Sequence, residues 1–151
     1  MPKVVLDSCV FCKLFLDEPD HQEAVALITE LSIQNYQVLV PSLFLYEVLS
    51  IAGVSPFSLS KANALITQYQ LANLDILELD QQTIVKAIEI CEQGHKKSGF
   101  PSFYDASYHA LAITHKCQFI TADKRHVAKA KGFGYVTLLS DWRSIVFRAN
   151  D

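Results

Sequence analysis

The sequence contains little glycine, little charge and no long apolar run. Its five glycines are scattered, so no glycine-rich loop for a nucleotide phosphate is present. No apolar run reaches the roughly 18 residues that a membrane span requires. The opening MPKVVLD becomes polar after three apolar residues, which is not typical of a signal peptide. These absences predict a soluble cytoplasmic protein that does not enter a membrane.

The composition predicts one compact domain over residues 1–151. Half of the residues are hydrophobic and 19% are charged, which is typical of a globular chain that buries a core without disulfides or a structural metal. The net charge of −3 provides no overall attraction to nucleic acid. A polyanionic partner would therefore have to be attracted by local basic residues or by a bound metal.

Short apolar runs alternate with segments of helical period. The expected strands are 4–6, 38–40, 74–79, 118–121 and 135–138. The expected helices are 9–16, 21–34, a helix that opens at Pro41-Ser42, 58–71, a helix after Asp80, 103–116 and 123–131. This alternation, without repeats or linkers, predicts an α/β fold: a three-layer α/β/α sandwich with a mostly parallel central sheet.

Four carboxylates occupy strand ends or apolar helices. Asp7 follows the first strand run, and Asp123 follows the fourth, in FITADKR. Asp105 lies in the first turn of SFYDASYHALA, and Glu47 is the only charge in SLFLYEVLSIAG. Parallel sheets bind ligands beyond the carboxyl ends of their strands, which is where these acids are expected.

Each acid also has a structural interpretation. Asp7 and Asp123 could be helix N-caps, and Ser102-x-x-Asp105 fits a capping box. Glu47 could point outward to solvent. However, its neighbours one helical turn away offer no cation, and a buried carboxylate without a partner is costly. Glu47 is therefore expected beside Asp7, in an acidic crevice that raises its pKa.

Taken together, the four acids predict a metal site. Carboxylates that converge repel one another unless cations bind between them, and oxygen-only ligand sets suit Mg²⁺ or Mn²⁺. Such a set is also the ligand set of two-metal phosphodiester hydrolysis.

The segments VVLDSCVFCKLFLDEP, PSLFLYEVLSIAG, SFYDASYHALA and FITADKR, in this order, resemble the PIN (PilT N-terminus) domain, and most closely the VapC-type toxin ribonucleases. The resemblance implies RNA cleavage with Mg²⁺ or Mn²⁺ at Asp7, Glu47, Asp105 and Asp123, leaving 5′-phosphate and 3′-hydroxyl ends. It implies supporting hydroxyls at Ser8 and Thr121, and a basic residue of the first helix at Lys13. The family often has Asn where Ser50 stands, and some members carry a further acid where Arg125 stands.

The surroundings of the acids supply candidates for RNA contacts. These are Lys13, Lys96, Lys97, Lys124 and Arg125. Four aromatic residues near the acids are expected in the core rather than stacked on bases: Tyr46, Phe103, Tyr104 and Tyr108.

Other chemistries fit the sequence less well. Cys9-x-x-Cys12 follows a strand as a redox pair would, but the helix after Pro41 does not match a thioredoxin-like fold. Zinc lacks a second ligand pair at the required spacing. Nucleophilic catalysis by Asp7 in the haloacid-dehalogenase manner would need Asp-x-Asp, and Cys9 occupies the second position.

The sequence therefore favours a metal-dependent endoribonuclease, as the toxin of a type II toxin–antitoxin pair. The expected partners are RNA, a cognate antitoxin and a second copy in a homodimer. Two alternatives remain open at this stage. One is a non-catalytic module of the same fold that binds RNA or protein, and the other is a PIN-type nuclease with a housekeeping RNA or DNA substrate.

Overall fold

A computed structural model describes residues 1–146 and contains a single five-stranded sheet within them. The strands are β1 (Lys3–Leu6), β2 (Gln37–Pro41), β3 (Leu74–Leu77), β4 (Gln118–Thr121) and β5 (Val136–Leu138). Their order across the sheet is β3-β2-β1-β4-β5, and every neighbouring pair is parallel. The predicted strands agree with these bounds to within two residues.

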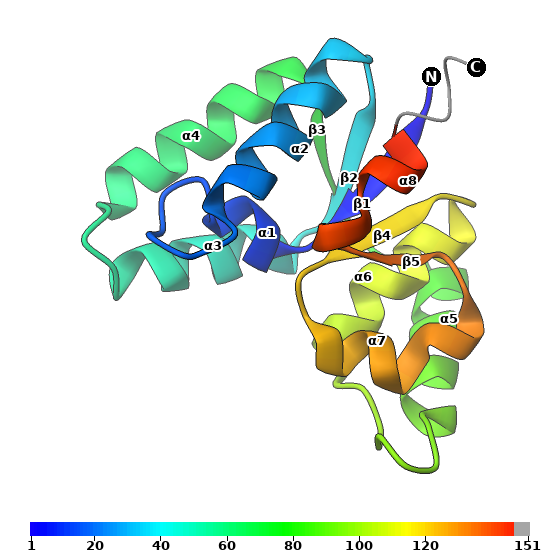
Figure 1. Cartoon of the computed structure of the whole chain (residues 1–151). Coiled ribbons are helices and arrows are strands. Elements are labelled where there is room, and N and C mark those ends of the chain that lie inside the picture. The colour runs from blue at the N-terminus through cyan, green and yellow to red at the C-terminus, as the bar shows by residue number, and fades with distance from the viewer. Residues whose placement is uncertain (147–151) are drawn as a thin grey trace.

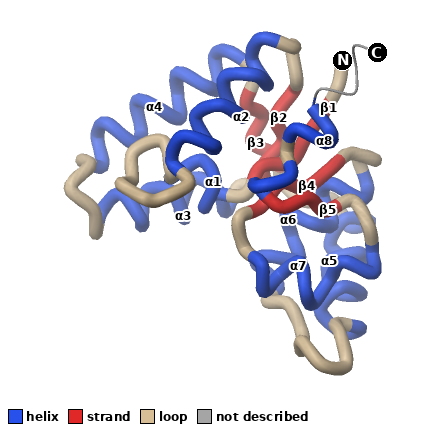
Figure 2. Tube along the Cα trace, in the orientation of Figure 1, coloured by secondary structure: helices blue, strands red, loops and turns tan. Residues whose placement is uncertain are grey.

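Helices cover both faces of the sheet, which confirms the predicted three-layer α/β/α architecture (Figures 1 and 2). The chain forms α1 (Ser8–Cys12), α2 (His21–Ile33), α3 (Leu43–Gly53), α4 (Leu59–Ala72), α5 (Gln81–Gln93), α6 (Phe103–Thr114), α7 (Lys124–Ala130) and α8 (Arg143–Val146). In Figure 1, α2 and α8 lie on one side of the sheet and α5 and α6 on the other. Within residues 1–146, no helix combines the length and the apolar character that crossing a membrane requires.

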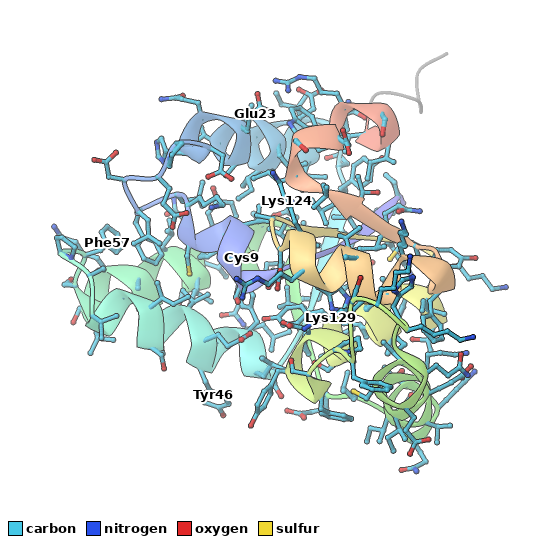
Figure 3. All side chains as sticks on the ribbon, turned by 60° about the horizontal axis from the view of Figure 1, so that its bottom comes forward. Cys9, Glu23, Tyr46, Phe57, Lys124 and Lys129 are labelled. Atoms are coloured by element: carbon cyan, nitrogen blue, oxygen red, sulfur yellow. The ribbon has the colours of Figure 1, made fainter. Side chains whose placement is uncertain are left out.

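The first predicted helix and the C-terminal segment differ from expectation. The helix predicted over 9–16 ends at Cys12 and continues as turns. The helix α8 was not predicted, and it is attached to α2 by Glu23, whose Oε2 accepts hydrogen bonds from Trp142 Nε1 (2.8 Å) and Arg143 Nη1 (2.6 Å). Figure 3 labels Glu23 on α2, beside the C-terminal helical turns. A four-residue helix is too short to be stable without such contacts.

The order of the strands places a reversal of the winding at the carboxyl ends of β1 and β4, where a ligand-binding crevice is expected. From β1 the chain proceeds outward to β2 and β3, and then returns to the other side of β1 for β4 and β5. Where the winding reverses in this way, a crevice opens beyond the carboxyl ends of the two central strands. Here those strands are β1 and β4. At their carboxyl ends, the Asp7 N–H donates a hydrogen bond to the Ile120 carbonyl (3.0 Å).

The main core packs around the three central strands. Val4, Val5 and Leu6 are at most 2% exposed, as expected for a parallel strand that is covered on both faces. On the α1 side, the Phe11 ring packs edge-on against Phe44 (5.2 Å between centroids) and Tyr69 (5.5 Å). These contacts join α1, α3 and α4, so they hold the helices that follow β1 and β2 in position.

A second, smaller core joins α5, α6 and α7. It consists mostly of alanines, and Ala106, Ala110 and Ala130 are at most 1% exposed. Small side chains let helix backbones approach closely, which brings α5 and α6 together, and Ala130 joins α7 to this core.

We predict that Phe11→Ala lowers the free energy of unfolding by about 3–5 kcal/mol, because it removes a buried ring from a packed aromatic cluster. Leu71→Ala is the matched control, since Leu71 is 86% exposed on α4 and its loss should change the stability by less than about 0.5 kcal/mol. Urea unfolding of both variants measures the difference, and equal losses would contradict this description of the core.

Candidate active site

Asp7 is the most buried carboxylate of the crevice, with 7% of its surface exposed. Its Oδ2 accepts a hydrogen bond from Thr121 Oγ1 (2.7 Å) on β4, and its Oδ1 accepts from Ser8 Oγ (3.4 Å). Oδ1 also accepts from the Cys9 backbone N–H (3.5 Å), so Asp7 is the N-cap of α1 as well. Asp7 therefore caps α1 and also belongs to the group of four acids, so both interpretations apply to it.

Glu47 extends from α3 to the same point. Its Oε1 accepts hydrogen bonds from Tyr108 Oη (2.6 Å) and from Ser8 Oγ (3.2 Å). Ser8 Oγ lies within hydrogen-bond distance of both carboxylates, and its single proton is shared between Glu47 Oε1 and Asp7 Oδ1. Glu47 is half-buried, and burial raises its pKa, to which the negative charge of Asp105 adds. Its position and the direction of its pKa shift are those expected from the sequence.

Tyr108 is the residue of this site that the sequence did not reveal. It was expected in the core, and it is indeed 1% exposed, but its hydroxyl donates the shortest hydrogen bond to Glu47. Its spacing could have indicated this role, because Tyr108 lies one helical turn after Asp105 and therefore on the same face of α6.

Asp105 connects the four carboxylates electrostatically. It lies in the first turn of α6, whose N-cap Ser102 accepts a hydrogen bond at Oγ from the Asp105 N–H (3.2 Å). Burial is the main cause of its raised pKa, and the charge of Asp123 raises it further. In turn, the charge of Asp105 adds to the effect of burial on Asp7 and Glu47. The four predicted acids therefore lie close enough for Asp105 to interact electrostatically with each of the other three.

Asp123 caps a helix, as its structural interpretation predicted. It is the N-cap of α7, and its Oδ1 accepts from the backbone N–H groups of Arg125 (2.9 Å) and His126 (3.2 Å). Its own N–H donates to Thr121 Oγ1 (3.0 Å). Thr121 therefore contacts both Asp7 and Asp123, and it fixes the ends of β1 and β4 relative to each other.

The chemistry of these donors fits a hard divalent cation. The four acids contribute only oxygen ligands, and the hydrogen bonds to Asp7 and Glu47 come from hydroxyl and amide groups rather than from a Lys or Arg. Within residues 1–146, no three His, Cys, Asp or Glu side chains already lie in an arrangement that could hold a metal ion. The crevice thus has suitable ligands, but their spacing is wider than that of a closed coordination shell.

Lys13 does not extend into the crevice as a free cation. Its ammonium is buried and lies 2.5 Å from Glu18 Oε2 and 2.9 Å from Asp20 Oδ1. The His21 ring also contacts the Lys13 carbonyl through Nδ1, at 2.5 Å. These contacts close the turn between α1 and α2, so the geometry gives Lys13 a structural partner and does not support the predicted contact with RNA.

The other four basic candidates are exposed near the acids in the sequence. Lys124 and Arg125 form the first turn of α7, directly after Asp123, and Figure 3 shows Lys124 and Lys129 projecting from this helix. Lys96 and Lys97 lie in a loop that is closed by the pairing of His95 with Gly99. Their contact with RNA remains a prediction.

Three of the four aromatic residues expected in the core are exposed instead. Tyr46 is 67% exposed, Tyr104 66% and Phe103 43%. They lie on α3 and in the first turn of α6, on helix faces that no other element of the described chain covers. Figure 3 shows Tyr46 pointing away from the molecule. The prediction was wrong because it relied on the apolar neighbours of these residues in the sequence, which do not show which face of a helix packs against the rest of the protein.

The cysteines have the character of buried thiols. Burial raises the pKa of Cys12 to about 12, and it raises that of Cys9 further still. All four cysteines are free. A thiol needs its thiolate form to react, so this environment does not favour a redox pair.

Two buried histidines join the helices that carry Asp105 and Asp123. His109 Nε2 contacts the Gly134 carbonyl (2.7 Å), so in the neutral ring this nitrogen carries the proton. Nδ1 then accepts from His126 Nε2 (3.1 Å), which leaves the buried Nδ1 of His126 without a hydrogen-bond partner. Burial lowers the pKa of both rings to about 4, so the pair is neutral at physiological pH.

We predict that the contribution of Asp7 to stability without metal falls as the pH rises from about 4 to about 6. Burial raises the pKa of Asp7 from 3.8 to about 6, so folding takes up a proton at Asp7 in this window, whereas His109 and His126, whose pKa values burial lowers to about 4, contribute in the opposite direction. Asp7→Asn should lose only the Asp7 contribution, so the slope of its stability with pH should differ from that of the wild type, and it should gain at most about 3 kcal/mol at neutral pH.

Urea unfolding across this pH range, in the presence of a chelator, measures the slope. The control Asp17→Asn changes an exposed carboxylate and should keep the wild-type slope. An unchanged slope in Asp7→Asn would show that Asp7 is ionised throughout.

The chain resembles a set of solved toxin–antitoxin structures. VapBC-1 from nontypeable Haemophilus influenzae has a TM-score of 0.69 and 13% identity, and the match covers 91% of this chain and 98% of that one. VapBC2 from Rickettsia felis, bound to a DNA fragment from its promoter, has a TM-score of 0.66 at 15% identity, over 90% and 96% of the two chains. The Sarcin-Ricin loop cleaving toxin VapC20 from Mycobacterium tuberculosis has a TM-score of 0.66 at 15% identity, over 88% and 96%.

At these identities the likeness is one of fold. No curated protein matches the chain in sequence. The family model of the PIN domain, in contrast, matches residues 4–132, a span that includes both strand ends of the crevice and all four carboxylates. The chain therefore belongs to the PIN domain family.

Proposed function

We propose that this protein is a metal-dependent endoribonuclease and the toxin of a type II toxin–antitoxin pair. The observation that supports this function best is the group of four carboxylates at the reversal point of the sheet, where burial, and to a smaller extent the charge of Asp105, raises the pKa of both Asp7 and Glu47. Membership of the PIN family and the likeness to VapC structures support the same activity.

The proposed cation is Mg²⁺ or Mn²⁺, held by Asp7, Glu47, Asp105 and Asp123. When bound, it supplies Lewis-acid activation of water and offsets the negative charge that develops at the phosphate. The protein's own contribution is to fix the ligands in place. Thr121 holds Asp7, while Tyr108 and Ser8 hold Glu47, so these two carboxylates would be kept in position for the cation.

Hydroxyl groups also keep the crevice able to take up a cation. Each donates a hydrogen bond to an ionised acid without neutralising its charge, as a Lys or Arg at the same point would do. The exposed Lys124 and Arg125 follow Asp123 directly and could bind the phosphates on either side of the scissile bond. Hydrolysis in this site would leave the 5′-phosphate and 3′-hydroxyl ends that the family resemblance implies.

The proposed partners follow from the relatives. Two of the similar structures are complexes of a toxin with its antitoxin, and VapC20 is a toxin that cleaves the Sarcin-Ricin loop. We therefore propose RNA as the substrate and a cognate antitoxin as the inhibitor, with a homodimer as the assembled form. An adjacent reading frame for a small DNA-binding protein would support the toxin role.

The central test is cleavage of RNA by the purified protein with Mg²⁺ or Mn²⁺, and its loss with EDTA. We expect Asp7→Asn and Asp105→Asn each to lower the cleavage rate by at least about 100-fold, because each removes one of the acids that hold the cation. Asp17→Asn changes an exposed acid outside the crevice and should retain the wild-type rate.

Thermal unfolding provides a second readout that does not depend on activity. Mn²⁺ should raise the melting temperature of the wild type and of Asp17→Asn, but not that of Asp105→Asn, because a cation that binds only the folded site stabilises it. If Asp105→Asn retained full metal-dependent cleavage, the assignment of the site would be wrong. If the wild type bound RNA in EDTA and never cleaved it with either metal, the protein would be a binding module.

A further inference from the structure

We propose that His109 and His126 are positioning residues, which hold Asp123 opposite Asp105 so that both acids can bind the cation. This proposal rests on the proposed function and deepens it, because it gives the cation site two supporting residues that are not among its ligands. It starts from a pair of buried side chains that the proposed mechanism leaves unused.

His109 contacts α7 at its start and just beyond its end. At the start, His109 Nδ1 lies 3.1 Å from Nε2 of His126, which is in the first turn of the helix. Beyond the end, His109 Nε2 lies 2.7 Å from the carbonyl of Gly134, which follows the short 3₁₀-helix Lys131–Phe133. A single side chain of α6 therefore bonds to both flanks of α7 and limits the sliding and tilting of this helix.

Side chains, rather than close backbone packing, join α7 to α6. Among the elements of residues 1–146, the main neighbours of α7 are β5 and the 3₁₀-helix, whereas α6 packs mainly against α5 and the central strands. Ala130 attaches the last residue of α7 to the alanine core of α5 and α6. The histidine pair is the corresponding contact at the first turn of α7, which Asp123 caps.

Each histidine is attached to one of the two acids. Asp105 lies one helical turn before His109, so the two residues share a face of α6. The backbone N–H of His126 donates to Asp123 Oδ1 (3.2 Å), so the residue whose ring bonds to His109 also holds this carboxylate. Burial raises the pKa of Asp105 and the charge of Asp123 raises it further, which places the two carboxylates within electrostatic reach of each other.

The two acids need such a link because they repel each other. Without a cation, the repulsion between Asp105 and Asp123 acts on the first turns of α6 and α7. Both imidazole rings are neutral at physiological pH, so the hydrogen bond between them resists this repulsion and adds no charge that would compete with a cation. The Phe119 ring on β4 supports both imidazoles, at 5.9 Å from His109 and 5.6 Å from His126 between centroids.

Stability alone does not account for the pair. Within residues 1–146, the buried Nδ1 of His126 has no hydrogen-bond partner, which is costly for a polar atom. Replacing both partners of a buried hydrogen bond by apolar groups of similar shape is close to neutral or stabilising. The imidazoles pack edge-on, with 5.2 Å between centroids and 70° between planes, and two phenylalanines favour the same arrangement. The polar pair therefore serves the site rather than the fold.

The test compares the double variant His109→Phe, His126→Phe with the wild type. The variant removes the hydrogen bonds and keeps two aromatic rings, so its melting temperature should equal or exceed the wild-type value. We expect it to bind Mn²⁺ about 10- to 100-fold more weakly, as is typical when residues that orient metal ligands are lost. The paramagnetic resonance signal of free Mn²⁺ measures the affinity. RNA cleavage should need correspondingly more Mn²⁺, and excess Mn²⁺ should restore part of the rate.

Amide hydrogen exchange in EDTA provides a readout that does not depend on metal. Arg125 and His126 donate their backbone N–H groups to Asp123, so their exchange reports how firmly the first turn of α7 is held. In the double variant these two amides should exchange at least about 5-fold faster, which corresponds to the contribution of one buried hydrogen bond. The amides of α5 should exchange as in the wild type.

Thr83→Val, Thr114→Val is the matched control. These threonines also join two helices by a side-chain hydrogen bond, from α5 to α6 (3.1 Å between the Oγ1 atoms). Thr114, however, is the last residue of α6, whereas Asp105 lies in its first turn. The control should keep the wild-type Mn²⁺ affinity and the wild-type exchange at α7.

Two further variants keep the test independent of how well phenylalanine fits. His109→Gln retains one donor and one acceptor, so it should lose less Mn²⁺ affinity than the double variant. His126→Leu introduces a smaller side chain and removes the ring contact with α6. It should show the same weakening of Mn²⁺ binding and the same faster exchange, measured at a temperature where thermal unfolding shows it to be folded.

The outcomes separate this proposal from the nuclease itself. A wild type that cleaves RNA, together with a folded double variant of unchanged Mn²⁺ affinity and unchanged exchange at α7, would refute the positioning role alone. An equal loss of Mn²⁺ affinity in the threonine control would also refute it, because the pair would then act through general stability. A wild type that neither binds Mn²⁺ nor cleaves RNA would refute the proposed function and the role of the pair toward a cation with it.

Discussion

The hydrogen bond from Thr121 to Asp7 fixes the geometry on which the rest of the site depends. It joins the last residue of β4 to the residue after β1, at the point where the winding of the sheet reverses. Asp7 is removed from water there, which is costly for a carboxylate, and the donors around it are hydroxyl and amide groups. Burial raises the pKa of Asp7, and the hydrogen bond from Thr121 lowers it in part, so Asp7 is held in place without a neutralising Lys or Arg.

The helix α6 organises the remaining residues around this point. Its first turn provides Asp105, one turn further Tyr108 holds Glu47 of α3, and His109 contacts His126 of α7. The alanines on its other positions allow close packing against its neighbours. Through these contacts, α6 reaches Glu47 directly and reaches α7, the helix that begins after Asp123.

Around the acidic crevice, the surface combines exposed lysines with exposed aromatic rings. The proposed RNA substrate is a polyanion that the net negative charge and the four acids repel, and the exposed lysines would offset this repulsion. Lys13, by contrast, is near the site in sequence but is engaged by Glu18 and Asp20. Proximity to the site in sequence is therefore not enough to assign a basic residue to the substrate.

The parallel α/β architecture could be predicted from the sequence, as could the position of the four acids at strand ends and helix starts, because buried strands and helix caps leave local patterns. Which side chains contact one another could not be predicted in this way. Glu47 and Tyr108 are 61 residues apart, and Asp7 and Thr121 are 114 apart, so no local pattern specifies their contacts. The same holds for α8, which is anchored by Glu23, and for the exposure of Tyr46 and Tyr104. An apolar residue in a helix is buried only if another layer covers that face, and the coverage of each face follows from the packing of the whole chain.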